Sequence, residues 1–346
     1  MTKGKKRIKI EYSFAINRYK NLPINIFLTL LTEMTDTKSI ESRHISVLLD
    51  ELVDSININS DRKNIIVDTT LWMWWHASKI IEKMNAWDTL IWFDADIKNL
   101  ELAKIRLDKV NKDKKVEVIL INSNFLNLKE ELAKQKIWKI TWIYYDLWLS
   151  SLHLDEADRW FSFMLEWPLD MRLDKTKWKT AADIVNWYTA QELRNIFLKY
   201  WEEPGSNKIS ARIVERRKKE KFKTTTDLSE IIPWWPKTKS RIFQAIRIEV
   251  NKELENLEIS LKDAIDLLDK NGKIFVISFH SLEDRIVKQI LKLETKDCIC
   301  RDIICSCGHT KCLKLITKKP IIPTDKEIKD NPRSRSAKAR CAEKII

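Results

Sequence analysis

The stretch of residues 65–76 constrains the fold of this chain more than any other part of the sequence. An apolar run ends at Asp68, a short loop follows, and a helical pattern begins near His76. A second apolar run, residues 90–93, ends at Asp94. Strand, loop, helix, strand and acid, in this order, are typical of one half of a nucleotide-binding fold, in which the second acid hydrogen-bonds a ribose.

Further apolar runs extend this plan along the chain. Residues 116–121 and 137–146 have strand patterns, and helical patterns at 77–84 and 99–110 lie between the strands. Strands that alternate with helices predict an α/β fold with a doubly wound, mostly parallel sheet. Ligands of such sheets bind beyond the carboxyl ends of the strands. Four residues fall at these ends: Asp68, Asp94, Phe125 and Asp146.

The pattern becomes almost purely helical after about residue 155. Strand character returns only at 273–280, and a helix pattern follows it. The sequence therefore predicts an inserted all-helical domain within an α/β domain. The expected limits are 1–39 for an N-terminal extension, 40–154 together with 262–346 for the α/β domain, and 155–261 for the insertion.

The charge balance favours a polyanionic partner. The chain carries 63 Lys and Arg against 50 Asp and Glu, a net charge of +13. Nucleic acid is the first candidate, and a basic protein with a solvated surface is the alternative. No apolar run reaches the ~18 residues of a membrane span, and the first residues lack the pattern of a signal peptide. We therefore expect a cytoplasmic protein.

Tryptophan is abundant and glycine scarce, with 15 Trp and 4 Gly in 346 residues. Glycine usually makes up about 7% of a chain. Many of the tryptophans occupy contexts typical of glycine, such as turns and positions before proline, and three lie in the loop at Trp72, Trp74 and Trp75. We hypothesise that these codons are UGA, read as glycine in the host. A truly tryptophan-rich protein is the alternative.

With glycine at the tryptophans, the loop from Asp68 to His76 becomes D-T-T-L-G-M-G-G-H. Glycine there allows positive φ and a close approach of the backbone to a cofactor. The N-terminus of the following helix can face a carboxylate or phosphate. A full G-x-G-x-x-G pattern is missing, which weakens the case for a nicotinamide cofactor.

Five further motifs follow in order along the chain. They are Asp146-Leu-Trp-Leu-Ser-Ser151, Asp158-Arg-Trp-Phe-Ser-Phe163, Pro168-Leu-Asp-Met-Arg172, Phe279-His-Ser-Leu-Glu-Asp-Arg285 and Asn331-Pro-Arg-Ser-Arg-Ser-Ala-Lys338. Together they resemble the RsmH (MraW) family, from about residue 44 to 344. Members of that family are S-adenosylmethionine-dependent methyltransferases that modify N4 of a cytidine in the decoding centre of 16S rRNA.

The resemblance implies a Rossmann-like methyltransferase fold with an inserted domain for rRNA. The expected substrate is 16S rRNA in the 30S subunit or in a late assembly intermediate. The resemblance also implies cofactor contacts, although His153 falls where many relatives have Gln. These contacts are Trp74, Trp75, His76, Asp94, Phe125, Asp146 and His153.

Methyl transfer from a sulfonium is an in-line displacement, so positioning contributes most. The lone pair of an exocyclic cytosine amine is delocalised, and an acceptor for its proton would assist. Asp146 is the first candidate for this acceptor, with His280 and Glu283 as further candidates. Pure cofactor binding is the alternative role for Asp146. The target base has to leave its stack to reach the methyl group.

Basic residues supply candidate contacts to RNA phosphates. A solvated helix face or a surface ion pair is the alternative for each of them. The candidates are Arg216, Arg217, Arg285, Arg333 and Arg335.

The cysteines near the C-terminus follow the pattern C-x-C-x4-C-x-C-G-H-x2-C. Thiolates this dense, without a secretion signal, favour zinc over disulfides. The spacing C-x-C is tighter than the common C-x2-C, so free reduced thiols are the alternative. The candidate ligands are Cys298, Cys300, Cys305 and Cys307.

Two other functions remain open at this point. A non-catalytic rRNA-binding assembly factor is favoured if the loop tryptophans are real, because indoles would fill the space of the cofactor and Trp rarely adopts positive φ. A methyltransferase of another nucleic acid is the second alternative. The Asn-Pro-Pro-Tyr type of motif is absent, which counts against DNA.

Overall fold

The computed structural model describes residues 46–70, 75–95, 97–147, 166–175, 178–201, 204–233, 235–300 and 306–346. These residues form one sheet of seven strands in the order β3-β2-β1-β4-β5-β7-β6. All neighbours are parallel except β7, which is antiparallel to β5 and β6. The strands are β1 Ile65–Asp68, β2 Thr89–Asp94, β3 Glu117–Asn122, β4 Ile140–Asp146, β5 Leu268–Ser278, β6 Leu313–Leu315 and β7 Lys338–Lys344. The predicted doubly wound, mostly parallel sheet is confirmed.

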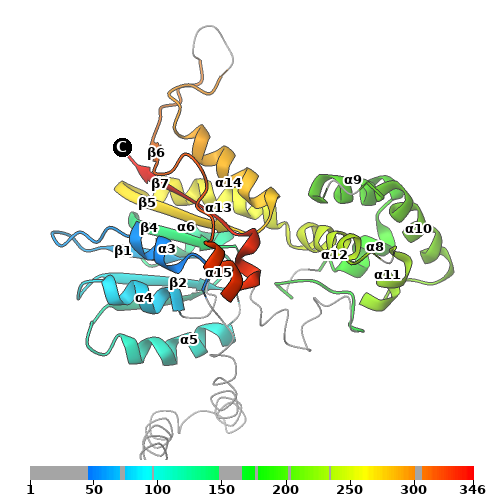
Figure 1. The fold of residues 1–346 in the computed structure, drawn as a ribbon, viewed down its shortest axis with the longest axis horizontal. Helices are drawn as coiled ribbons and strands as arrows, with labels where there is room; N and C mark the ends of the chain where they lie inside the picture. Colours follow the sequence, from blue (N-terminus) through cyan, green and yellow to red (C-terminus); the bar gives the residue numbers. More distant parts are fainter. Residues whose placement is uncertain are drawn as a thin grey trace, which may run out of the picture.

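The central strands are buried on both faces, which explains their nearly continuous apolar sequences. In β2, alternate residues contribute to opposite cores: Leu90 and Trp92 to one, and Ile91 and Phe93 to the other. Each face is covered by helices (Figure 1). One face packs against α3 Leu49–Ser55, α4 Trp75–Lys83 and α5 Ile97–Val110. The other packs against η1 Phe125–Asn127, α6 Leu128–Lys134, α13 Glu253–Leu267 and α14 Ser281–Leu293.

A separate group of helices lies to one side of the sheet (Figure 1). It has its own hydrophobic core, in which Phe197, Phe222 and Ile246 are buried. Capping boxes at Thr180 and Thr224 satisfy backbone N–H groups at two helix starts. The helices are α8 Ala181–Trp187, α9 Ala190–Trp201, α10 Ser206–Lys219, α11 Thr225–Ile231 and α12 Pro236–Asn251. The predicted helical insertion is therefore present.

The transition back to the sheet occurs at Lys252. This residue has a left-handed backbone, φ 54°, between the end of α12 and the start of α13. Buried leucines of α13, such as Leu257 and Leu261, join the core of the sheet. The limits predicted for the insertion, 155–261, stay a prediction.

The chain ends in α15 Asp325–Asp330, η2 Pro332–Ser336 and β7. In Figure 1, α15 lies on the side of the sheet that faces the helical group, and β7 runs through the sheet to the C-terminus on the opposite side. Among the described residues, no helix combines the length and the apolar character needed to cross a membrane.

Candidate active site at the carboxyl ends of the strands

Four parallel strands end in polar residues along one edge of the sheet. Asp68, Asp94, Asn122 and Asp146 are the last residues of β1, β2, β3 and β4. Because parallel strands point the same way, these ends meet along one edge, where ligands of doubly wound sheets bind. The predicted positions of Asp68, Asp94 and Asp146 at this edge are confirmed.

Asp146 lies at the centre of this edge and is 1% exposed. Its backbone N–H donates to Oγ1 of Thr70 at 2.7 Å, which ties the end of β4 to the loop after β1. Its carboxylate Oδ2 lies 3.8 Å from Nδ1 of His76. The structure thus brings together two residues that the sequence places 70 positions apart.

His76 enters this arrangement from the start of α4 and is 2% exposed. Its Nε2 lies 3.3 Å from the carbonyl oxygen of Val47. A carbonyl only accepts hydrogen bonds, so Nε2 carries a proton and donates it. The ring also packs edge-on against Tyr144, at 5.8 Å between centroids. The imidazole is therefore fixed in orientation, with Nδ1 toward Asp146.

Asp68 is a buried carboxyl that sequence reasoning placed at a strand end but did not assign to the site. It accepts hydrogen bonds from the backbone N–H of Thr70 at 3.0 Å, from the indole of Trp92 and from the hydroxyl of Tyr144. Complete burial raises its pKa well above the usual range, although these donors oppose the shift, and nearby Asp146 raises it further. The sequence contained one signal for including Asp68 in the site: it is an acid that ends the first buried strand.

Asp94 and Phe125 occupy the neighbouring part of the same edge. Oδ2 of Asp94 accepts a hydrogen bond from Nδ2 of Asn99 at 3.1 Å, and its backbone carbonyl accepts one from Asn122 at 3.0 Å. The ring of Phe125 stands edge-on to Tyr145, 6.0 Å between centroids. Both side chains are only partly buried, so an acceptor and an aromatic ring are available to a ligand here.

His280 and Glu283 form the turn between β5 and α14. His280 is the N-cap residue, and its Nδ1 accepts from the backbone N–H of Glu283 at 3.4 Å. Oε2 of Glu283 accepts from the backbone N–H groups of Phe279 and His280, and Oε1 lies 2.8 Å from Nε2 of His280. Both side chains therefore hold the turn, and their catalytic role stays a prediction.

The two basic residues predicted on α10 are engaged inside the helical group. Nη1 of Arg216 donates to the carbonyl of Glu220 at 2.6 Å, and Nη1 of Arg217 donates to the carbonyl of Val185 at 2.8 Å. Arg285, Arg333 and Arg335 are exposed instead. A phosphate can therefore reach Arg285, Arg333 and Arg335 more easily than the two arginines of α10.

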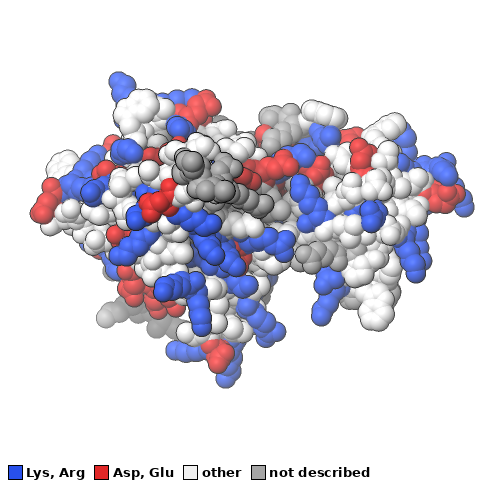
Figure 2. All heavy atoms as spheres, turned by 90° about the horizontal axis from the view of Figure 1, so that it is seen from above, with Lys and Arg blue, Asp and Glu red and all other residues white. Residues whose placement is uncertain are grey.

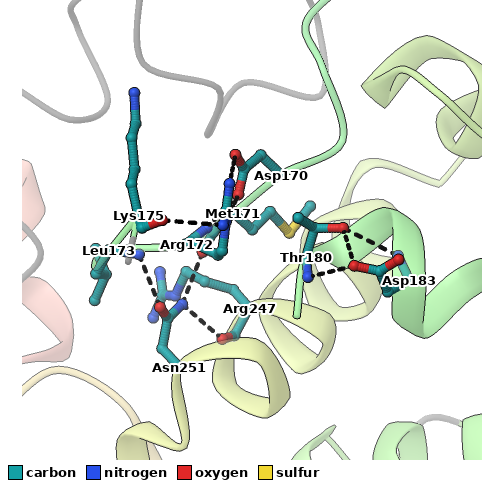
Figure 3. A network of polar contacts seen from close by, with 9 residues as sticks. All are labelled: Asp170, Met171, Arg172, Leu173, Lys175, Thr180, Asp183, Arg247 and Asn251. Carbon is teal, nitrogen blue, oxygen red and sulfur yellow. Dashed lines mark hydrogen bonds and ion pairs between the residues drawn. The ribbon is translucent and has the colours of Figure 1, made fainter. Parts of the chain in front are cut away.

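The motif from Pro168 to Arg172 forms a loop clamped to the end of α12 (Figure 3). Nδ2 of Asn251 donates to the carbonyl of Met171 and Oδ1 accepts from the N–H of Leu173, both at 2.8 Å. Arg172 forms two hydrogen bonds with Asp170, at 2.6 and 2.9 Å. Burial raises the pKa of Asp170, but these bonds outweigh it and lower the pKa overall. Met171 has φ 59°, a left-handed backbone that these contacts stabilise.

Some predicted residues lie outside the described part of the chain. They are Trp74, His153, Cys305 and the side chain of Trp75. Cys298, Cys300 and Cys307 are described. They lie close together in the connection between α14 and β6, and β6 is the edge strand opposite β3.

Comparison with known proteins gives consistent matches over most of the chain. Residues 41–345 match the model of the MraW methylase family. The chain is 42% identical over 316 residues to "Ribosomal RNA small subunit methyltransferase H" of Clostridioides difficile, which covers 88% of this chain and all of that protein. A protein of the same name from Caldicellulosiruptor saccharolyticus is 44% identical over 311 residues, covering 87% of this chain and 99% of that protein.

Proposed function

The chain belongs to the MraW methylase family and is an S-adenosylmethionine-dependent methyltransferase of small-subunit rRNA, and on this premise we propose that it methylates N4 of a cytidine in the decoding centre of 16S rRNA. The observation that carries this proposal is the buried arrangement of Val47, His76 and Asp146 at the carboxyl ends of the strands. It presents a fixed carboxylate at the place where a doubly wound sheet binds its ligand.

The residues beside this carboxylate fit the nucleoside part of S-adenosylmethionine. Asp94 keeps one carboxylate oxygen bonded to Asn99 and is partly exposed, so it can accept hydrogen bonds from ribose hydroxyls. Phe125 offers an aromatic ring on the next strand end for the adenine. When bound, the cofactor supplies an electrophilic methyl group, and the chain supplies the position of the acceptor amine.

Asp146 is the group best placed to accept a proton from the amine. Its burial removes water that would otherwise compete, Thr70 holds its backbone N–H, and its Oδ2 lies 3.8 Å from Nδ1 of His76. The nucleophilic nitrogen becomes cationic as it takes the methyl group, so it has to lose one proton. A carboxylate at this position both attracts that developing charge and accepts the proton.

We also propose that most or all of the tryptophans of this sequence are glycines in the native protein. Five of the described tryptophan side chains are exposed, an unusual environment for this residue. They are Trp87, Trp138, Trp178, Trp187 and Trp235.

The backbone and the core support the same proposal. Trp87 has φ 76°, in the region that glycine adopts without strain. Among the described residues, the buried Nε1 of Trp142 has no hydrogen-bond partner, which is costly for an indole. With glycine at 72, 74 and 75, the loop before α4 would let the backbone approach the cofactor closely.

The surface is suited to a folded RNA. The net charge is +13, and Figure 2 shows Lys and Arg side chains over both the sheet and the helical group, including either side of the notch between them. Exposed Arg285, Arg333 and Arg335 come from the two motifs that meet at the carboxyl end of β5, the strand beside β4. We therefore propose the 30S subunit or a late assembly intermediate, in the cytoplasm, as the partner.

Two measurements test these proposals separately. Mapping of N4-methylcytidine in 16S rRNA, with and without the gene, should show one modified decoding-centre cytidine that disappears in its absence; an unchanged modification would refute the proposed target. Mass spectrometry of the native protein should give glycine in the peptide that contains positions 74 and 75. Tryptophan in that peptide would refute the recoding.

A further inference from the structure

The connection between α14 and β6 forms an arm that extends beyond the sheet (Figure 1). Its two limbs are joined at the base. The backbone N–H groups of Cys312 and Leu313 donate to the carbonyl of Glu294 at 2.9 and 3.0 Å, and Lys311 pairs with Asp297 at 3.4 Å. The limbs therefore run side by side as they leave the sheet. Methyl transfer, as proposed above, uses none of these residues.

Three cysteines converge just beyond this base. Sγ of Cys298 lies 3.2 Å from Sγ of Cys300 and 3.9 Å from Sγ of Cys307, and all three sulfurs lie within 4.8 Å of one another. Thiolates at a tetrahedral zinc ion, each about 2.3 Å from the metal, are about 3.8 Å apart. The distance from Cys298 to Cys307 is close to this value and that from Cys298 to Cys300 is shorter, so the three sulfurs are near enough to share one ion after a small adjustment.

A disulfide explains the same cluster less well. It requires two sulfurs at about 2.05 Å and would leave the third sulfur unpaired. Cys298 and Cys300 lie on one limb and Cys307 on the other, so a shared ion would also join the two limbs. Gly308, next to Cys307, has φ 61° and open space around it, which allows the chain to turn there.

From this geometry we propose that Cys298, Cys300 and Cys307 bind a thiophilic divalent metal, zinc first, which joins the two limbs of the arm. A fourth ligand completes the tetrahedron. His309 is turned toward Glu294 instead, with Nε2 3.9 Å from Oε2.

Two other cysteines provide an internal control. Cys312 and Cys341 are buried and lie outside the cluster. Burial raises the pKa of Cys312 to about 11 and that of Cys341 to about 12, so both remain thiols near neutral pH. Cys312 lies in the same arm, so Cys312→Ala changes a cysteine without changing the proposed ligands.

The test uses the full-length protein, purified under reducing conditions and without added chelator. We expect about one equivalent of zinc by elemental analysis, and thiolate-to-metal charge-transfer absorption after replacement by Co²⁺. Cys298→Ser combined with Cys307→Ser should lose at least tenfold in Zn²⁺ affinity, measured by competition with a chromogenic chelator. Cys312→Ala should keep the stoichiometry and the affinity.

Three results would overturn the proposal. The first is wild-type protein that binds less than 0.1 equivalent of Zn²⁺ when the ion is supplied. The second is a double variant that binds as tightly as the wild type. The third is an intact mass 2 Da below that of the reduced chain, with a Cys298–Cys300 peptide cross-link, in protein purified without oxygen. None of these results depends on methyl transfer, so they do not bear on the proposed function.

Discussion

Nδ1 of His76 lies 3.8 Å from Oδ2 of Asp146, and both side chains are almost completely buried. His76 lies in the first turn of α4, the helix after β1, and Asp146 is the last residue of β4. Both lie at the edge of the sheet formed by the carboxyl ends of the strands, where doubly wound sheets bind their ligands. The first prediction concerns what the carboxylate of Asp146 does.

Asp146→Asn should lower the rate of methyl transfer to 30S particles by about 10²–10⁴-fold, because an amide cannot accept the amine proton. Transfer of a labelled methyl group measures the rate, and calorimetry measures cofactor affinity. A large loss of rate with little loss of affinity indicates proton acceptance. An equal loss of both indicates that Asp146 only binds the cofactor. Asp266→Asn, an exposed carboxylate, should change neither quantity.

Asp68 should make the stability of the protein depend on pH. Burial raises its pKa in the folded state, so the folded protein binds this proton more tightly than the unfolded chain. The stabilisation that comes from protonated Asp68 is therefore complete below its pKa in the unfolded chain, about 4. It is lost as the pH rises through the higher pKa of Asp68 in the folded protein.

Asp68→Asn removes this titration and should flatten the corresponding part of the curve. Urea unfolding from pH 4 to 8 gives the free energy of unfolding at each pH. The exposed Asp54→Asn should keep the wild-type dependence. If Asp68→Asn also follows the wild-type curve, Asp68 is not the group responsible.

Trp87→Gly should stabilise a protein that is produced with tryptophan at the positions given in the sequence. Residue 87 has φ 76° and its side chain is 76% exposed, so the change relieves about 1–2 kcal/mol of backbone strain and removes little buried area. Trp138 is also exposed, at 67%, but is not among the residues with positive φ. Trp138→Gly should therefore destabilise by about 0.5–1 kcal/mol. Thermal or urea unfolding of the two variants compares them, and equal effects would contradict the strain at residue 87.

Asn251→Ala should loosen the loop that contains Met171. The change leaves the carbonyl of Met171 and the N–H of Leu173 without their side-chain partner, at a cost of about 1–3 kcal/mol. Hydrogen exchange should increase in residues 168–175 while the sheet keeps its protection. Gln191→Ala removes an exposed side-chain hydrogen bond on α9 and should leave exchange unchanged. If residues 168–175 of Asn251→Ala exchange hydrogen at the wild-type rate, the contacts of Asn251 are not needed to hold the loop.

Much of the fold could be predicted because its signals are local. Apolar runs of strand length, helical spacing between them and acids at the strand ends are visible in any short window of the sequence. They predicted β1 to β4, the helical insertion and the positions of Asp94 and Asp146. The separated motifs added the family, which the comparisons show.

Other features depend on which groups surround a side chain in the folded chain, and they could not be predicted in this way. Arg217 was predicted from a basic run to contact phosphate, and in the structure its Nη1 donates to the carbonyl of Val185, 32 residues away in sequence. Its contact with phosphate stays a prediction. Glu283 was predicted as a candidate base, and in the structure its carboxylate also caps the start of α14. Its catalytic role stays a prediction. A residue type indicates which bonds a side chain can make, and the neighbours decide which of them it does make.

The sequence by itself determined the parallel strands β1 to β5, the inserted helices, the acids at the strand ends and the family, because periodicity and motif order are properties of the chain alone. The antiparallel strands β7 and β6, which extend the sheet beyond β5, were not predicted. Only the tertiary structure decided that Asp68 is buried beside Tyr144, that His76 lies near Asp146, and that three cysteines from two limbs converge. Packing brings these groups together across long separations in sequence. Burial then changes the energies of their charged forms, which no local pattern records.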